Sequence, residues 1–185
     1  IQGLSGQYTG ILADGLPLFG GQPGSFGVMQ LAPLDLKQAE VIKGAATALY
    51  GPSALGGLLN LVSRPAERKA LDIAINQSGE RGSDLLAWGS TRASATTGLT
   101  LSGDLHHQGE RDLDGDRWSD VAEFTRRSIR PRLFVNWPSG DQLFATAGLM
   151  SESREGGYAA GSPENYRERL ETTRLDWGLS ASRTL

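Results

Sequence analysis

Hydrophobic and polar residues alternate along most of the chain from Ala70 onward. A period of two is typical of β-strands, because successive side chains point to opposite faces of a sheet. Polar connections separate the alternating segments. We therefore expect six strands, at Ala70–Ser78, Ser83–Ala93, Thr97–His107, Arg126–Trp137, Gln142–Glu152 and Arg169–Ser182.

The fourth segment shows how different the two faces are. Ile129, Leu133 and Val135 share one face, whereas Arg130 and Arg132 lie on the other. Such a sheet suits a membrane β-barrel with an apolar outer surface and a polar interior. It also suits a soluble antiparallel sheet with one dry face. Strands of about 9–12 residues fit a tilted membrane crossing better than the ~5–6 residues usual in soluble sheets.

The expected connections differ in length in an ordered way. The two long ones, Gln108–Thr125 and Ser153–Glu168, would lie on the same side of an up-and-down meander. The connections on the other side, Ser94–Thr96 and Pro138–Asp141, are short. Outer-membrane barrels have short periplasmic turns and longer extracellular loops, so the connection lengths favour a membrane barrel.

The first part of the chain, up to Arg68, is rich in glycine and has a mixed pattern. Asp14-Gly15 is expected to form a tight turn between two strands, because both residue types tolerate a positive φ. We expect strands at Tyr8–Ala13, Leu16–Phe19, Ala39–Lys43 and Leu58–Ser63, helical turns at Leu34–Gln38 and Ala45–Tyr50, a loop at Gly20–Gly27, and a core formed by Val41, Ile42, Leu58, Leu59 and Leu61.

Composition narrows the classes of function. The chain has 185 residues and a net charge of −3, which argues against a nucleic-acid binder with a basic face. It has no cysteine, and therefore no disulfide framework and no thiolate nucleophile. No signal peptide opens it, and no apolar run reaches the ~18 residues of a transmembrane helix. Because G-x-x-x-x-G-K-[ST] and G-x-S-x-G motifs are also missing, no enzyme is expected.

Five short segments occur in an order and spacing that resemble the plug domain of TonB-dependent outer-membrane receptors. They are I-Q-G-L at Ile1, I-L-A-D-G-L-P-L at Ile11, A-E-V-I-K-G at Ala39, A-L-Y-G at Ala48 and G-G-L-L-N-L-V-S-R-P at Gly56. The resemblance is strong over the first third of the chain. Beyond it, the strand pattern and the loop D-L-D-G-D-R-W-S-D at Asp112 match more loosely.

The resemblance implies a fold class: an α+β plug segment followed by antiparallel transmembrane β-barrel strands, mainly β. Residues 1–69 would be the C-terminal part of the plug domain, and residues 70–185 the first six of about 22 barrel strands. The chain would then be a fragment of a receptor, cut at both ends. By itself it would neither insert nor transport, and its last strand would present an open edge.

The resemblance also implies a function. The parent protein would be a receptor and gated channel in the outer membrane of a Gram-negative bacterium, surrounded by outer-membrane lipid. It would take up a ferric siderophore or a similar iron chelate, and cobalamin or another metal chelate is the alternative cargo. TonB and its inner-membrane energising complex would be its partners. An alternative from another class is a soluble or surface-attached β-rich module that binds its ligand in a calcium-dependent way.

The resemblance implies that one loop of the first part of the chain contacts the substrate. The loop Leu16–Met29 resembles the plug apex, which touches substrate in this family, and its side chains best able to do so are Phe19, Gln22, Ser25 and Phe26. They could equally belong to an ordinary loop.

Charged residues would connect the plug with the barrel wall. Lys43 stands where the family often has arginine, and plug cations in the family face acidic groups of the wall. Arg126, Arg130 and Arg132 share the polar face of their strand and could pair with plug carboxylates such as Asp35 or Glu40. They could also attract an anionic chelate or be solvated.

Four aspartates surround a glycine in the loop before the fourth barrel strand: Asp112, Asp114, Asp116 and Asp120. Alternating carboxylates around a glycine can direct oxygens at one calcium ion, and some cobalamin receptors of the family bind calcium in loops of this kind. A solvated acidic loop is the alternative. No other cofactor is expected. The two histidines, His106 and His107, are adjacent on a strand and point to opposite faces, so they cannot jointly bind a metal.

Overall fold

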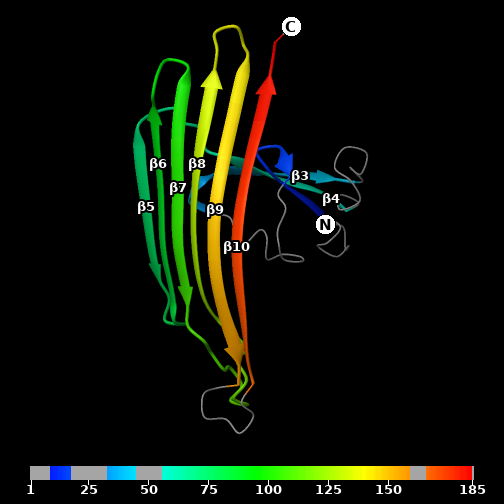
Figure 1. Cartoon of the computed structure of the whole chain (residues 1–185), viewed down its shortest axis with the longest axis vertical. Helices are drawn as coiled ribbons and strands as arrows, with labels where there is room; N and C mark the ends of the chain where they lie inside the picture. The colour runs from blue at the N-terminus through cyan, green and yellow to red at the C-terminus, as the bar shows by residue number, and fades with distance from the viewer. Residues whose placement is uncertain (1–8, 18–32, 45–55, 159–165, 185) are drawn as a thin grey trace. The chain divides into compact units, whose positions relative to one another are not determined.

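The chain consists of two compact units, Ile1–Pro65 and Ala66–Leu185, each built on its own β-sheet (Figure 1). The structure, a computed structural model, describes residues 9–17, 33–44, 56–158 and 166–184. No helix within these ranges is both long enough and apolar enough to cross a membrane. The family resemblance placed the domain boundary at residue 69, and the break between the compact units falls just before it, after Pro65.

The sheet of the first unit has four strands in the order β2-β1-β4-β3. These are β1 (Thr9–Ala13), β2 (Leu16–Pro17), β3 (Leu36–Lys43) and β4 (Gly57–Ser63). β1 runs parallel to β4, and the other two pairs are antiparallel. Leu12 on β1 and Leu58 on β4 form the buried cluster of the described part of this unit.

The expected turn at Asp14-Gly15 is confirmed. Asp14 has a φ of 53° and Gly15 a φ of 76°, as a type I′ hairpin turn requires. The turn is also tied to β4, because the Asp14 carboxylate accepts hydrogen bonds from the backbone N–H and the hydroxyl of Ser63 at 2.7 and 2.8 Å. The Gly15 N–H donates to the side-chain oxygen of Asn60 at 3.0 Å.

One expectation for the first unit is met in part and another is wrong. A helical turn does form at the start of Leu34–Gln38, but it is a short 3₁₀ turn, η2 (Pro33–Asp35), and β3 begins directly after it, because Leu36 pairs with β4. Val41 and Ile42 do not join the core: they are 53% and 49% exposed. The reason is that β3 is an edge strand, which the pattern of apolar residues alone could not reveal. The loop at Gly20–Gly27 and the helical turn at Ala45–Tyr50 lie outside the described residues.

The sheet of the second unit confirms the six expected strands, which pair in sequence order with every neighbour antiparallel. They are β5 (Ala70–Gln77), β6 (Gly82–Arg92), β7 (Thr97–Gln108), β8 (Glu123–Asn136), β9 (Gln142–Gly157) and β10 (Arg167–Ser182). β9 continues past Glu152 to Gly157, because its polar end still pairs with β10.

The connections of this sheet follow the expected alternation. Successive strands run in opposite directions, so the β7–β8 and β9–β10 connections leave the sheet at the same end (Figure 1). The turns at 93–96 and 137–141 lie at the opposite end and are short. We call that opposite end the short-turn end.

The two faces of the six-stranded sheet differ sharply in exposure. On the apolar face, Leu71, Ile75 and Trp177 are 70%, 79% and 80% exposed, so no described layer of the chain covers them. On the polar face, Trp88 and Ser102 are nearly inaccessible to solvent. A soluble sandwich would bury its apolar face against a second sheet, whereas the apolar face of this sheet is the exposed one.

We predict that Gly57→Ala will destabilise the first unit far more than Gly15→Ala. Both glycines have a positive φ, 116° and 76°, which costs an alanine about 1–2 kcal/mol. An added Cβ at Gly57 would also overlap the backbone oxygen of Ile42, whereas at Gly15 it would meet nothing within 4 Å. Overpacking of this kind typically costs a further ~1–3 kcal/mol.

The measurement is the free energy of unfolding by denaturant, in the full natural polypeptide that contains this sequence, followed by protease accessibility of the first unit. Equal losses for the two variants would show that the close approach between Gly57 and β3 is wrong.

Candidate functional site

The polar face of the six-stranded sheet carries a continuous row of hydrogen-bonding side chains. The strand register places Asn76 opposite Asp84, Asp84 opposite His106, His106 opposite Arg126 and Arg126 opposite Glu152. One residue from each of five neighbouring strands thus lies side by side on the same face. We call these five residues the polar row.

His106 is held between two aspartates within and beside this row. Its Nδ1 lies 2.7 Å from Asp84 on β6, and its Nε2 lies 3.0 Å from Asp104, two residues earlier on β7. Asn76 donates to Asp84 at 2.8 Å, and the Ser128 hydroxyl donates to Asp104. Both ring nitrogens therefore have an aspartate partner. The imidazole connects β6 to β7, and neither of its nitrogens is available to bind a metal.

At the other end of the polar row, Glu152 forms ion pairs with two arginines. Its carboxylate lies 3.4 Å from Arg126 on β8 and 3.3 Å from Arg154 on its own strand. The side chains of Glu152 and Arg126 are only 2% and 9% exposed, so this is a buried ion pair. Both guanidinium groups also lie over the ring of Phe124, at 5.7 and 4.6 Å, a distance at which cation–π attraction contributes.

A second ion pair crosses a whole strand. Arg130 on β8 reaches Asp176 on β10, with 2.7 Å between the guanidinium and the carboxylate. Its guanidinium passes over Gly148 on β9, where any Cβ would collide with it. The glycine therefore creates the space for this pair, and Arg174 approaches the same carboxylate at 3.3 Å.

The structure locates the residues expected to join the plug and the barrel wall. Arg130 pairs with Asp176 inside the six-stranded sheet. Arg132 is buried on the polar face, at 6% exposure, and Lys43 is exposed at the end of β3. The pairing of these three with the partner unit stays a prediction. The apex residues Phe19, Gln22, Ser25 and Phe26 lie outside the described residues.

The acidic loop brings three of its four aspartates together. Carboxylate oxygens of Asp112, Asp114 and Asp116 lie within 4.8 Å of one another, all exposed to solvent. The Asp120 carboxylate instead accepts a hydrogen bond from the Leu113 N–H at 2.8 Å, and it is not part of this group. Three clustered carboxylates have the oxygen chemistry of a calcium site.

The charges of the loop influence one another. The Asp116 N–H donates to the Asp114 carboxylate, which favours its ionised form, but partial desolvation and the negative charges of the neighbouring aspartates outweigh this bond and raise the pKa of Asp114 above its ordinary value. The Gly115 and Arg117 N–H groups lower the pKa of Asp112. The loop is thus a cluster of repelling charges that a cation would relieve.

Sequence reasoning did not foresee how the β7–β8 loop docks on the end of β9. Ser119 donates its N–H to the Gly157 carbonyl at 2.9 Å, and its hydroxyl accepts from the Gly157 N–H at 2.7 Å. A Cβ at Gly156 would press against Ser119 and Ala122. The only signal in the sequence was the pair of adjacent glycines.

Aromatic rings reinforce this docking. Trp118 lies edge-on to Tyr158, with 5.1 Å between ring centroids, and stacks on Tyr166 at 6.1 Å. Trp118 and Tyr158 also form an isolated β-bridge. The ends of β9 and β10 are therefore connected to the β7–β8 loop through both backbone and side chains.

Comparison with known proteins identifies relatives of both units. Residues 1–58 match the family described as TonB-dependent Receptor Plug Domain. The chain is 25% identical over 197 residues to the vitamin B12 transporter BtuB of Vibrio vulnificus (strain YJ016), covering 95% of this chain and 32% of that protein. It is 26% identical over 174 residues to the ferrioxamine receptor of Yersinia enterocolitica, covering 89% and 22%. The chain thus spans a third or less of the length of these relatives.

Solved structures share the fold. The siderophore receptor PirA from Pseudomonas aeruginosa has a TM-score of 0.67 at 20% identity, covering 100% of this chain and 31% of that structure. The copper transporter OprC has a TM-score of 0.65 at 18% identity, covering 93% and 27%. At these identities the similarity shows the fold alone: a mainly β arrangement of plug and barrel strands.

We predict that Glu152→Ala will lower the free energy of unfolding by about 3–5 kcal/mol, because it leaves the buried charge of Arg126 without its partner. Glu171→Ala is the matched control, since Glu171 pairs with Arg169 on the surface, where the two side chains are 67% and 61% exposed; we expect a loss below about 1 kcal/mol there.

Unfolding of both variants is measured in the full natural polypeptide in detergent. Similar small losses for both would mean that water reaches the polar row freely.

Proposed function

Because this chain belongs to the TonB-dependent receptor family, we propose that it supplies plug and wall strands to an outer-membrane receptor that takes up a ferric siderophore or a similar iron chelate. The parent protein acts in the outer membrane of a Gram-negative bacterium. Its apolar face contacts lipid, and the polar row faces the interior of the barrel.

The observation that carries this proposal is the inverted burial of the six-stranded sheet. Leucine, isoleucine and tryptophan side chains are exposed, while Arg126, Glu152 and Asp104 are buried. In water this arrangement would leave a large apolar surface unprotected. In a membrane the same surface is solvated by lipid, and charged residues belong on the inner side of the wall.

Iron chelates are the first choice of cargo because one of the two relatives that match most of this chain is a ferrioxamine receptor.

Cobalamin is the second candidate. The match to a vitamin B12 transporter extends over 95% of the chain. The clustered aspartates 112, 114 and 116 also favour cobalamin, because some cobalamin receptors of the family bind calcium in loops of this kind. In either case, substrate bound from outside shifts the plug toward a state that TonB engages from the periplasm, and the inner-membrane complex supplies the energy. A ligand can drive this shift only through its different affinity for the two states.

The test is uptake by cells that lack this protein and are complemented with the full natural polypeptide. We expect radiolabelled iron supplied as ferrioxamine to enter these cells, and to fail to enter a strain without TonB. Cyanocobalamin labelled with radioactive cobalt is supplied in parallel.

Uptake of cobalamin alone would select the second cargo. Uptake of neither compound, with the protein recovered in the aqueous fraction after lysis, would instead favour a soluble binding module and contradict the proposal.

We also propose that the acidic loop binds one calcium ion through Asp112, Asp114 and Asp116. Calorimetric titration of calcium into the full natural polypeptide should show a binding event that Asp114→Asn weakens at least about tenfold, since it removes one charged oxygen ligand. The matched control is Asp120→Asn, whose carboxylate is already engaged by Leu113. Identical heats for the parent protein and Asp114→Asn would end this proposal.

A further inference from the structure

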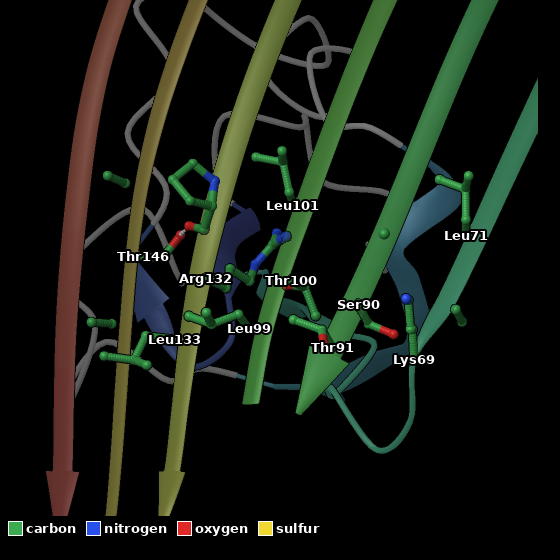
Figure 2. A pocket seen from close by; sticks show the side chains of 15 residues that line it. Lys69, Leu71, Ser90, Thr91, Leu99, Thr100, Leu101, Arg132, Leu133 and Thr146 are labelled. Atoms are coloured by element: carbon green, nitrogen blue, oxygen red, sulfur yellow. Dashed lines mark hydrogen bonds between the residues drawn. The ribbon is translucent and has the colours of Figure 1, made fainter. Parts of the chain in front are cut away.

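The apolar face of the six-stranded sheet contains a hollow of about 820 Å³ near the short-turn end. Leu71, Leu99, Leu101 and Leu133 line it (Figure 2), and Gly89 is another of its lining residues. Leu71, Leu99 and Leu101 are 70%, 41% and 51% exposed. Thr100 and Arg132, two polar-face residues that border it, are buried, so the hollow opens on the apolar face.

The strand register explains why the surface is hollow at this place. Gly89 pairs with Leu71 on one side and with Leu101 on the other. Both leucines project while the glycine between them contributes no side chain. A Cβ at Gly89 would meet the Leu71 side chain at 3.9 Å, an ordinary contact distance. The hollow is thus a space between side chains that a larger residue could fill.

A single cation stands at the rim of the hollow on its apolar side. Lys69 directly precedes β5, two residues before Leu71, and its side chain lines the hollow and is exposed. Figure 2 shows the Lys69 side chain extending along the edge strand beside the hollow. The described residues that line the hollow include Lys69 and Arg132 and no carboxylate.

We propose that this hollow holds an acyl chain of an anionic phospholipid, with the lipid phosphate on the Lys69 ammonium. This inference rests on the proposed function, because it requires the short-turn end to lie at the periplasmic leaflet, where phospholipids are found. An apolar trough that ends at a lysine has the two features of such a lipid: a hydrocarbon tail and a negatively charged headgroup.

The test is lipid retention by the full natural polypeptide, purified in detergent with equal amounts of phosphatidylglycerol and phosphatidylethanolamine of identical acyl chains. Native mass spectrometry counts the lipids that stay bound. We expect phosphatidylglycerol to be retained about fivefold over phosphatidylethanolamine, the effect of one basic residue near a charged headgroup. Lys69→Gln should abolish the preference but keep some lipid, and Gly89→Leu should reduce retention of both lipids at least fivefold.

Two variants serve as matched controls. Arg127→Gln removes a cation that is exposed on the same face but does not line the hollow, and Ala87→Leu places a leucine on the same strand outside it. Both should behave as the parent protein does. Equal retention of the two lipids by the parent protein would overturn the proposal, as would undiminished retention by Gly89→Leu.

The outcome can be separated from that of the proposed function by first confirming insertion into vesicles by flotation. A protein that inserts but shows no selective lipid contradicts only the lipid site, whereas a protein that does not insert contradicts the receptor. A dimer that forms at every lipid level and is lost in Gly89→Leu would show that a second copy covers the hollow, and would also overturn the proposal.

Discussion

The hydrogen-bond register from β5 to β10 is the constraint on which the second unit depends. Because side chains alternate with a period of two, a slip by one residue between β8 and β9 would put Arg126 and Glu152 on opposite faces of the sheet. It would at the same time bring Leu149 to the polar face. The six-stranded sheet therefore has strongly unequal energies for its correct and shifted pairings, and its two faces stay distinct along its full length.

Polar side chains of this face strengthen the register because their contacts connect separate strands. His106 joins β6 to β7, Arg126 joins β8 to β9, and Arg130 spans β9 to reach β10. Buried ionic groups contribute specificity more reliably than net stability, since each costs desolvation energy that only a well-placed partner offsets. In the proposed receptor, the same groups give the inner wall a fixed charge pattern.

Much of this arrangement can be predicted from the sequence. The features that cannot be predicted depend on contacts between residues that are distant in the chain. The six strands and the Asp14-Gly15 turn depend on local periodicity and turn chemistry, which a single sequence contains. The clamp on His106 depends on Asp84, which is distant in sequence and becomes a neighbour only through the register. The exposure of Val41 and Ile42 depends on which strand lies at the sheet edge, and apolar patterning is the same for edge and central strands.

Gly156 and Gly157 give the far end of the six-stranded sheet a mechanical property. Ser119 is bonded to Gly157, and the Trp118 ring contacts Tyr158 at the end of β9 and Tyr166 just before β10. The described part of the β7–β8 loop therefore cannot move away from the ends of these two strands without breaking those contacts, and a ligand that approaches this end of the sheet would meet one connected surface.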